Sequence, residues 1–228
     1  MTPALLLWDI DGTLIQSGGA GERALVRATE TTQNVSFDLH QLDWAGRTDR
    51  RIAEMILDRL GRPRTAESVA DLVEAYLDSL AEEIGRRQGT ILPGIASILE
   101  HIDKSDRFFQ GLLTGNMKRG AEIKLGHYGL WRYFPFGAFA DDAVHRNELG
   151  PHALRKAVAC HGVEFPPDRT FVIGDTPHDI DCGKVIGART IAVATGKYGV
   201  EALETHQPDA LFNDFADFEA LLNALEVL

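Results

Sequence analysis

Short runs of apolar residues alternate along this chain with segments of helical periodicity. The apolar runs cover 4–9, 108–114, 136–140, 170–175 and 189–195. Because polar residues do not interrupt these runs, they suit strands that are buried on both faces of a parallel sheet. Helical spacing recurs between them, at 95–102, 152–162 and 181–188. The sequence therefore predicts an α/β fold built on a doubly wound parallel sheet.

One long stretch breaks this alternation. Between residues 18 and 90 we find no convincing strand, only helix-like segments at 22–30, 51–60 and 66–84. Thr65 is a suitable N-cap for the last of them, and Gly85 follows its apolar stripe. We therefore expect an inserted α-helical domain over 18–90, on a core formed by 1–17 and 91–228. Glycine-containing segments near 16–20 and 88–93 are the expected hinges.

Charge and composition exclude several classes of partner. The net charge is −11 and no basic tail is present, so we expect no nucleic acid partner. No stretch approaches the roughly 18 uninterrupted apolar residues of a spanning helix, so we expect no membrane partner. The two cysteines, Cys160 and Cys182, form neither a metal-type pair nor a disulfide framework. Because the first residues lack a basic segment of the signal-peptide kind, the cytoplasm is the expected location.

Two carboxylates close the first apolar run, in the segment Asp9-Ile10-Asp11-Gly12-Thr13-Leu14. In doubly wound sheets, ligands collect at the carboxyl ends of the strands. Like charges this close are costly unless a cation lies between them or one carboxyl holds a proton. The functional interpretation makes Asp9 an ionised nucleophile beside a divalent metal and Asp11 a proton donor. A turn with two solvated carboxylates is the structural alternative.

Thr114-Gly115-Asn116 closes the second long apolar run. A hydroxyl and exposed backbone N–H groups after a strand can bind phosphate oxygens without adding charge. Thr114, Gly115 and Asn116 are therefore candidates for phosphate or substrate binding. The same tripeptide also occurs as an ordinary turn.

A second pair of carboxylates, Asp175 and Asp179, lies where the fourth apolar run ends. Magnesium prefers hard oxygen ligands and binds through one or two carboxylates together with a substrate phosphate. We expect Asp9, Asp175 and the backbone carbonyl of Asp11 to bind Mg²⁺ directly, and Asp179 to orient a bound water or the loop. Asp179 could also cap a helix that starts at residue 180.

Arg146 is the candidate for the cation that steadies Asp9 and the transferring phosphoryl group. It is the only lysine or arginine between residues 142 and 149. Lys156 competes for this role, but it falls in the middle of the predicted helix at 152–162, where a solvated position is expected.

In this order, the four motifs resemble those of the haloacid dehalogenase superfamily, specifically its phosphoglycolate-phosphatase-like members. The resemblance covers essentially the whole chain and implies a Rossmann-like core with a helical cap of the C1 type. By position, the family's nucleophile, general acid/base, phosphate-binding, basic and metal-binding roles fall on Asp9, Asp11, Thr114, Arg146, Asp175 and Asp179. The family pattern usually has lysine followed by proline at the basic position, where this chain has Arg146-Asn147. Arginine offers a planar fork rather than a point charge.

The segment Trp44-Ala45-Gly46-Arg47-Thr48-Asp49 resembles family segments that approach the active site from the cap. Arg47 is therefore a candidate contact for the substrate's second polar or anionic end, and a solvated loop arginine is the alternative.

The expected function is Mg²⁺-dependent hydrolysis of a small phosphorylated metabolite through an aspartyl-phosphate, with phosphoglycolate as one candidate substrate. Asp11 argues against a dehalogenase, and the lack of lysine in residues 16–90 argues against a cap-lysine Schiff base. A sugar phosphomutase of the same fold and a non-catalytic phosphate-binding module stay open as alternatives. The sequence does not specify an oligomeric state.

Overall fold

The computed structural model describes residues 3–228 and has a six-stranded sheet in the order β5-β4-β1-β6-β7-β8, with every neighbouring pair parallel. The strands are β1 (Ala4–Trp8), β4 (Phe108–Leu113), β5 (Gly137–Ala138), β6 (Thr170–Gly174), β7 (Arg189–Val193) and β8 (Ala210–Phe212). The predicted α/β class with a parallel sheet is confirmed.

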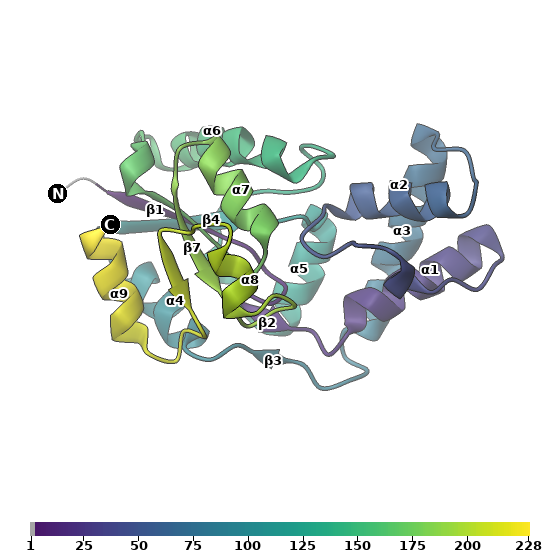
Figure 1. Ribbon diagram of the computed structural model, residues 1–228, viewed down its shortest axis with the longest axis horizontal. Helices are drawn as coiled ribbons and strands as arrows, with labels where there is room; N and C mark the ends of the chain where they lie inside the picture. Colours follow the sequence, from purple (N-terminus) through teal and green to yellow (C-terminus); the bar gives the residue numbers. More distant parts are fainter. Residues whose placement is uncertain (1–2) are drawn as a thin grey trace.

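Helices cover both faces of this sheet (Figure 1). The core helices are α4 (Ile95–Asp103), α5 (Lys118–His127), α6 (Leu149–His161), α7 (Pro177–Val185), α8 (Val200–Glu204) and α9 (Phe218–Val227). Leu6 and Trp8 of β1 pack in the cluster that contains α4, α5 and α9, whereas Leu5 and Leu7 pack in the one that contains α6 and α7. Successive side chains of a strand point to opposite faces, and this explains why β1 is apolar at every position.

Three helices are inserted between β1 and β4 and lie beyond one end of the sheet (Figure 1). They are α1 (Ala20–Gln33), α2 (Asp49–Arg59) and α3 (Ala66–Glu83). Thr65 is the N-cap of α3, as predicted, and its hydroxyl accepts a hydrogen bond from the Ser68 N–H at 3.1 Å. The helical insertion is thus confirmed, and its domain limits at 18 and 90 stay a prediction.

The chain enters and leaves this insert through a two-stranded antiparallel ribbon of β2 (Ile15–Gln16) and β3 (Thr90–Ile91). The insert has an apolar cluster of its own, which includes Ile56, Leu72 and Leu80. Helix α5 belongs to the core, yet its Ile123 packs against that cluster. Figure 1 shows α5 between the sheet and α3. Helix α5 is therefore the surface on which the insert rests.

Helix α7 differs from the expectation, because it begins at Pro177 rather than at residue 180. Thr176 is its N-cap and Asp179 is the third helical residue, and their side chains form a reciprocal capping box. The expectation that Asp179 is the N-cap is therefore corrected: Thr176 is the N-cap, and Asp179 contributes to capping from the third helical position. The proline at the first helical position fits this start.

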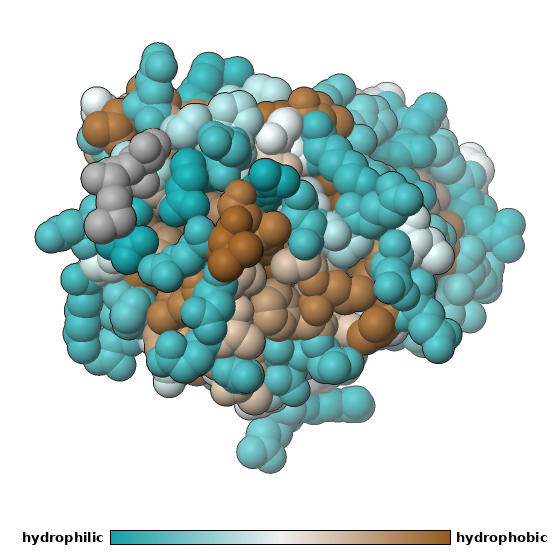
Figure 2. All heavy atoms as spheres, turned by 60° about the vertical axis from the view of Figure 1, so that its left-hand side comes forward, coloured by the Kyte–Doolittle hydropathy of each residue, from teal (hydrophilic) through white to brown (hydrophobic). Residues whose placement is uncertain are grey.

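Among residues 3–228, no helix combines the length and the apolar character that crossing a bilayer requires. Figure 2 shows a face on which hydrophilic residues surround smaller hydrophobic areas. Of the large hydrophobic side chains on the described surface, Val227 at the end of α9 is the most exposed, at 86%.

Candidate active site

The polar residues that follow three neighbouring strands meet at one edge of the sheet. Asp9 follows β1, Thr114 follows β4 and Asp175 follows β6, and all three side chains are buried. A cavity of about 400 Å³ opens at this edge, between the core and the inserted helices. The core contributes Asp9, Asp11 and Asp175 to its wall. The expected gathering of polar side chains at the strand ends is therefore observed.

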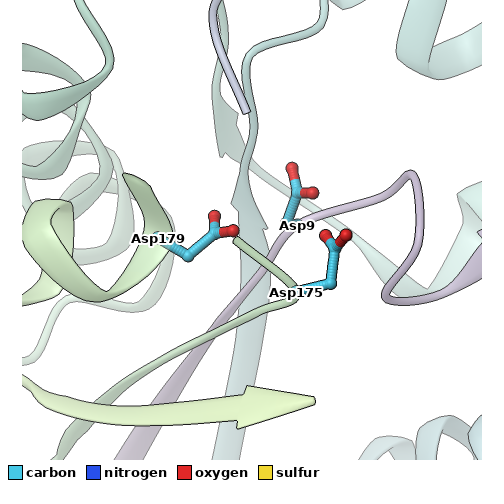
Figure 3. A group of neighbouring side chains, drawn as sticks. All are labelled: Asp9, Asp175 and Asp179. Carbon is cyan, nitrogen blue, oxygen red and sulfur yellow. The ribbon is translucent and has the colours of Figure 1, made fainter. Parts of the chain in front are cut away.

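Three carboxylates converge there (Figure 3). Asp9, Asp175 and Asp179 each offer an oxygen, and these oxygens lie within 4.8 Å of one another. Burial raises the pKa of Asp175 well above its usual value, and the charges of Asp9 and Asp179 raise it further. A divalent cation with a preference for oxygen ligands would relieve this repulsion. The donor set fits Mg²⁺, although it does not identify the ion.

Asp179 already has partners on both oxygens. Oδ2 accepts hydrogen bonds from the backbone N–H of Thr176 at 3.0 Å and from its hydroxyl at 2.8 Å. Oδ1 contacts the guanidinium of Arg146. Burial raises the pKa of Asp179 to about 6, while the charge of Arg146 opposes this rise. These contacts favour a role in orienting the α7 loop and Arg146.

Arg146 lies on the turn before α6 and is buried beside the nucleophile candidate. Its Nη2 is 2.9 Å from Oδ1 of Asp9, and Nη1 donates to the carbonyl of Gly46 in the insert at 3.0 Å. Lys156 lies elsewhere: its Nζ donates to the Gly137 carbonyl at 2.9 Å and is 2.7 Å from Asp142. Of the two candidate cations, Arg146 is the one that contacts Asp9.

Asp11 has a different cation. Its Oδ2 accepts a hydrogen bond from Nζ of Lys124 at 2.6 Å and one from the Asn116 amide at 3.0 Å. The same amide donates to the Thr114 hydroxyl at 2.8 Å. The sequence predicts a cation or a proton that reconciles Asp9 with Asp11, and this stays a prediction. The structure shows that each carboxylate also has a cation of its own: Arg146 contacts Asp9, as expected, and Lys124 contacts Asp11.

Sequence analysis missed Lys124. It is on helix α5, where a lysine is normally expected at the solvent face, but here it is only 3% exposed. Its charge is nevertheless favoured: burial alone would lower the pKa of Lys124, and the charge of Asp11 raises it above its usual value. In the sequence, the one link between Lys124 and the site is that it follows Asn116 by eight residues. Lysines at such a distance from a motif are common, so this spacing does not predict a buried position.

The insert closes the cavity with the turn that contains Arg47. This side chain lines the cavity, while its Nε donates to the Asp43 carbonyl at 2.7 Å. The turn packs tightly on the core: a Cβ on Gly115 would lie 2.4 Å from the Arg47 carbonyl oxygen. Gly115 and Arg47, both predicted to bind substrate, therefore meet at the junction between insert and core.

Asp49, the first residue of α2, forms two hydrogen bonds across this junction between insert and core. Its backbone N–H donates to the Gly115 carbonyl at 2.7 Å, and its Oδ2 accepts from the Met117 N–H at 2.7 Å. Burial raises the pKa of Asp49 to about 7.

The family model described as haloacid dehalogenase-like hydrolase matches residues 6–184. The chain is 30% identical to a pyrophosphatase, PpaX, of Anoxybacillus flavithermus, over 95% of each chain. It is 25% identical to phosphoglycolate phosphatase 1 of Pseudomonas aeruginosa, over 94% of this chain and 78% of the relative.

Among solved structures, a hydrolase from Pseudomonas syringae superposes with a TM-score of 0.77 at 22% identity and covers 96% of this chain and 98% of its own. That likeness supports the fold. With a family model that spans most of the chain and the expected carboxylates gathered at the strand ends, the chain belongs to the haloacid dehalogenase-like hydrolases.

Proposed function

We propose that this protein is a Mg²⁺-dependent phosphomonoesterase that hydrolyses a small phosphorylated metabolite through an aspartyl-phosphate on Asp9. The observation that carries the proposal is the surroundings of Asp9. This buried carboxylate contacts the guanidinium of Arg146, whose Nη2 also contacts Asp179, and it offers an oxygen within 4.8 Å of oxygens of Asp175 and Asp179. A nucleophile beside a fixed cation and beside carboxylates that can bind a metal suits attack on an anionic phosphate ester.

Asp9, Asp175 and the backbone carbonyl of Asp11 would hold the metal, and Asp179 would orient its surroundings. When bound, Mg²⁺ supplies positive charge that offsets the charges of the nucleophile and the ester. Arg146 holds the Asp9 carboxylate in place through its Nη2, which is 2.9 Å from Oδ1 of Asp9. The Thr114 hydroxyl and the backbone after β4 would bind the phosphoryl oxygens.

Asp9 attacks phosphorus and forms the new O–P bond while the bond to the leaving oxygen breaks. Asp11 gives its proton to that oxygen, which leaves as an alcohol. Asp11 then accepts a proton from the water that attacks the aspartyl-phosphate, and phosphate is released. The insert limits access of bulk water to the cavity during both steps.

The cavity volume, about 400 Å³, suits a small metabolite. Phosphoglycolate, an ester in one relative's name, is a candidate substrate, and pyrophosphate, in the other's name, is a small phosphoanhydride that would release phosphate in place of the alcohol. Both carry a second anionic group, for which Arg47 is the candidate contact on the insert. We favour a substrate of this small, doubly anionic class.

A panel of phosphate esters, assayed with Mg²⁺ and with EDTA, tests the function. The wild type should release phosphate only with Mg²⁺, and Asp9→Asn should release none while retaining the wild-type melting temperature. A mutase would isomerise sugar phosphates without net release, and a binding module would bind esters without turnover. Phosphate release by Asp9→Asn at the wild-type rate would identify another nucleophile.

Metal binding can be measured without turnover. Because a ligand that binds only the folded state stabilises it, Mg²⁺ should raise the melting temperature of the wild type, and EDTA should reverse the rise. Asp175→Asn should abolish this response, whereas Asp209→Asn, which changes an aspartate paired with Arg189 away from the cavity, should retain it. An equal response in Asp175→Asn would contradict the proposed ligand set.

A further inference from the structure

Lys124 carries a buried charge, and the reaction proposed above assigns it no role. Its Nζ is 2.6 Å from Oδ2 of Asp11 and 2.7 Å from Oδ1 of Asn116. The side chain lines the cavity although it is almost wholly shielded from solvent. Burying an ammonium is costly unless it is paired and hydrogen-bonded. This cost indicates that the position of the charge serves a purpose beyond packing.

Two helices of the insert, α1 and α3, cover Lys124. A Cβ on Gly21, at the start of α1, would lie 3.7 Å from Nζ of Lys124 and 3.8 Å from the Tyr76 hydroxyl of α3. Gly21 and Tyr76 therefore both lie against the ammonium. Lys124 is thus covered by two helices of the insert, whereas its partner Asp11 faces the cavity.

The hydrogen bonds to the Asp11 carboxylate all go to one of its two oxygens. Lys124 and Asn116 both donate to Oδ2, and Oδ1 accepts no hydrogen bond from any residue between 3 and 228. The Asp11 side chain is 42% exposed and faces the cavity. Two donors on one oxygen fix the rotation of the carboxyl group, and they leave the other oxygen free to face a ligand.

We propose that Lys124 is a positioning residue, which together with Asn116 fixes Asp11 through Oδ2 so that Oδ1 is the oxygen that exchanges the proton with the leaving group. In the first step, the proton on Oδ1 passes to the ester oxygen as its bond to phosphorus breaks. In the second step, Oδ1 accepts a proton from the attacking water. This inference rests on the proposed phosphatase function.

Two aryl esters of similar shape separate positioning from other roles. 4-Nitrophenolate leaves without much help from an acid, whereas phenolate needs a proton as it leaves. Lys124→Met should lower kcat/KM for phenyl phosphate by about 10–100-fold, which is less than the about 10²–10⁴-fold that a general acid contributes, because Asp11 itself is retained. For 4-nitrophenyl phosphate, the loss should be several times smaller.

Asp11→Asn should show the same dependence on the leaving group, and the double variant should be little worse than Asp11→Asn alone, because both changes disable one proton transfer. Lys104→Met is the matched control, since it removes an exposed lysine that forms a surface ion pair with Glu100 at 2.7 Å. It should leave both esters unaffected.

Equal losses with both esters, or a raised KM with unchanged kcat, would overturn the proposal and assign Lys124 to structure or to substrate binding. If Lys124→Met does not fold, Lys124→Leu, which likewise removes the donor, takes its place with the same criterion. A different result would refute the proposed function itself: the wild type would hydrolyse neither ester, or Asp11→Asn would match the wild type.

Discussion

Arg146 contacts groups from four separate parts of the chain. They are Asp9 after β1, Asp179 in α7, the carbonyl of Gly46 in the insert and the carbonyl of Leu113 in β4. Its Nε has no partner within the part of the chain that the structure describes. A guanidinium carries its donors on a wide planar fork, whereas the donors of an ammonium share one atom. Arginine at this position therefore reaches groups on separate elements from two nitrogens at once.

This arrangement leads to a prediction about the two candidate cations. Arg146→Ala should lower kcat by about 10²–10³-fold, because a preorganised donor near the reacting carboxylate is lost. Lys156→Ala should change kcat little, since it removes a partly exposed pair with Asp142. Steady-state kinetics of both variants on one ester measure this, and equal losses would contradict the assignment.

Most of the site could be predicted because its residues directly follow strands. Asp9, Thr114 and Asp175 end runs of buried apolar residues, and parallel strands bring such ends to one edge. Arg146 was found as the only cation in its segment. Lys124 could not be found, because its burial depends on how α3 and α1 pack over α5, and helical periodicity does not encode that packing.

The junction between insert and core relies on close approach of two backbones at Gly115. Gly115→Ala should lower kcat/KM at least about tenfold, because a Cβ 2.4 Å from the Arg47 carbonyl would force the turn off the core. Gly126→Ala on α5 is the matched control: nothing lies within 4 Å of its Cβ, and helical Gly→Ala changes are neutral or stabilising. Unchanged kinetics in Gly115→Ala would show that the turn is not seated on the core during turnover.

Long elements could be predicted, whereas of the short strands only β5 (Gly137–Ala138), which lies within the apolar run at 136–140, could be. The runs at 4–9, 108–114 and 170–175 are long enough for their composition to specify buried strands. The ribbon strands β2 and β3 have two residues each, too few for any periodicity. Strands β2 and β3 pair because the two ends of the insert lie side by side in the folded chain. The local sequence of each strand does not encode this proximity.

Folding stability should depend on pH through Asp49. Burial raises the pKa of this carboxyl from 3.8 to about 7. Between these values the folded chain holds a proton that the unfolded chain has lost, so the free energy of unfolding falls as pH rises. Asp49→Asn removes this contribution and should gain stability relative to the wild type through that interval, by at most about 1.4 kcal/mol per pH unit.

Chemical denaturation at several pH values between those two pKa values measures this difference. Asp141→Asn is the control, because exposed Asp141 accepts the neighbouring N–H of Lys118 at 2.7 Å. Its difference from the wild type should not grow over the same interval. A constant difference for Asp49→Asn would mean that its carboxyl is not buried in solution.

The hydrogen bond from Arg146 to the Gly46 carbonyl ties the insert to the cation that contacts Asp9. Any movement of the insert away from the sheet breaks this bond and leaves the guanidinium only its partners in the core. If Asp9 is the nucleophile, as proposed, admission of a new ester and the electrostatic environment of Asp9 are linked through one side chain. Substitutions that shift the turn around Gly46 should then alter the rate of opening and the reactivity of Asp9 together.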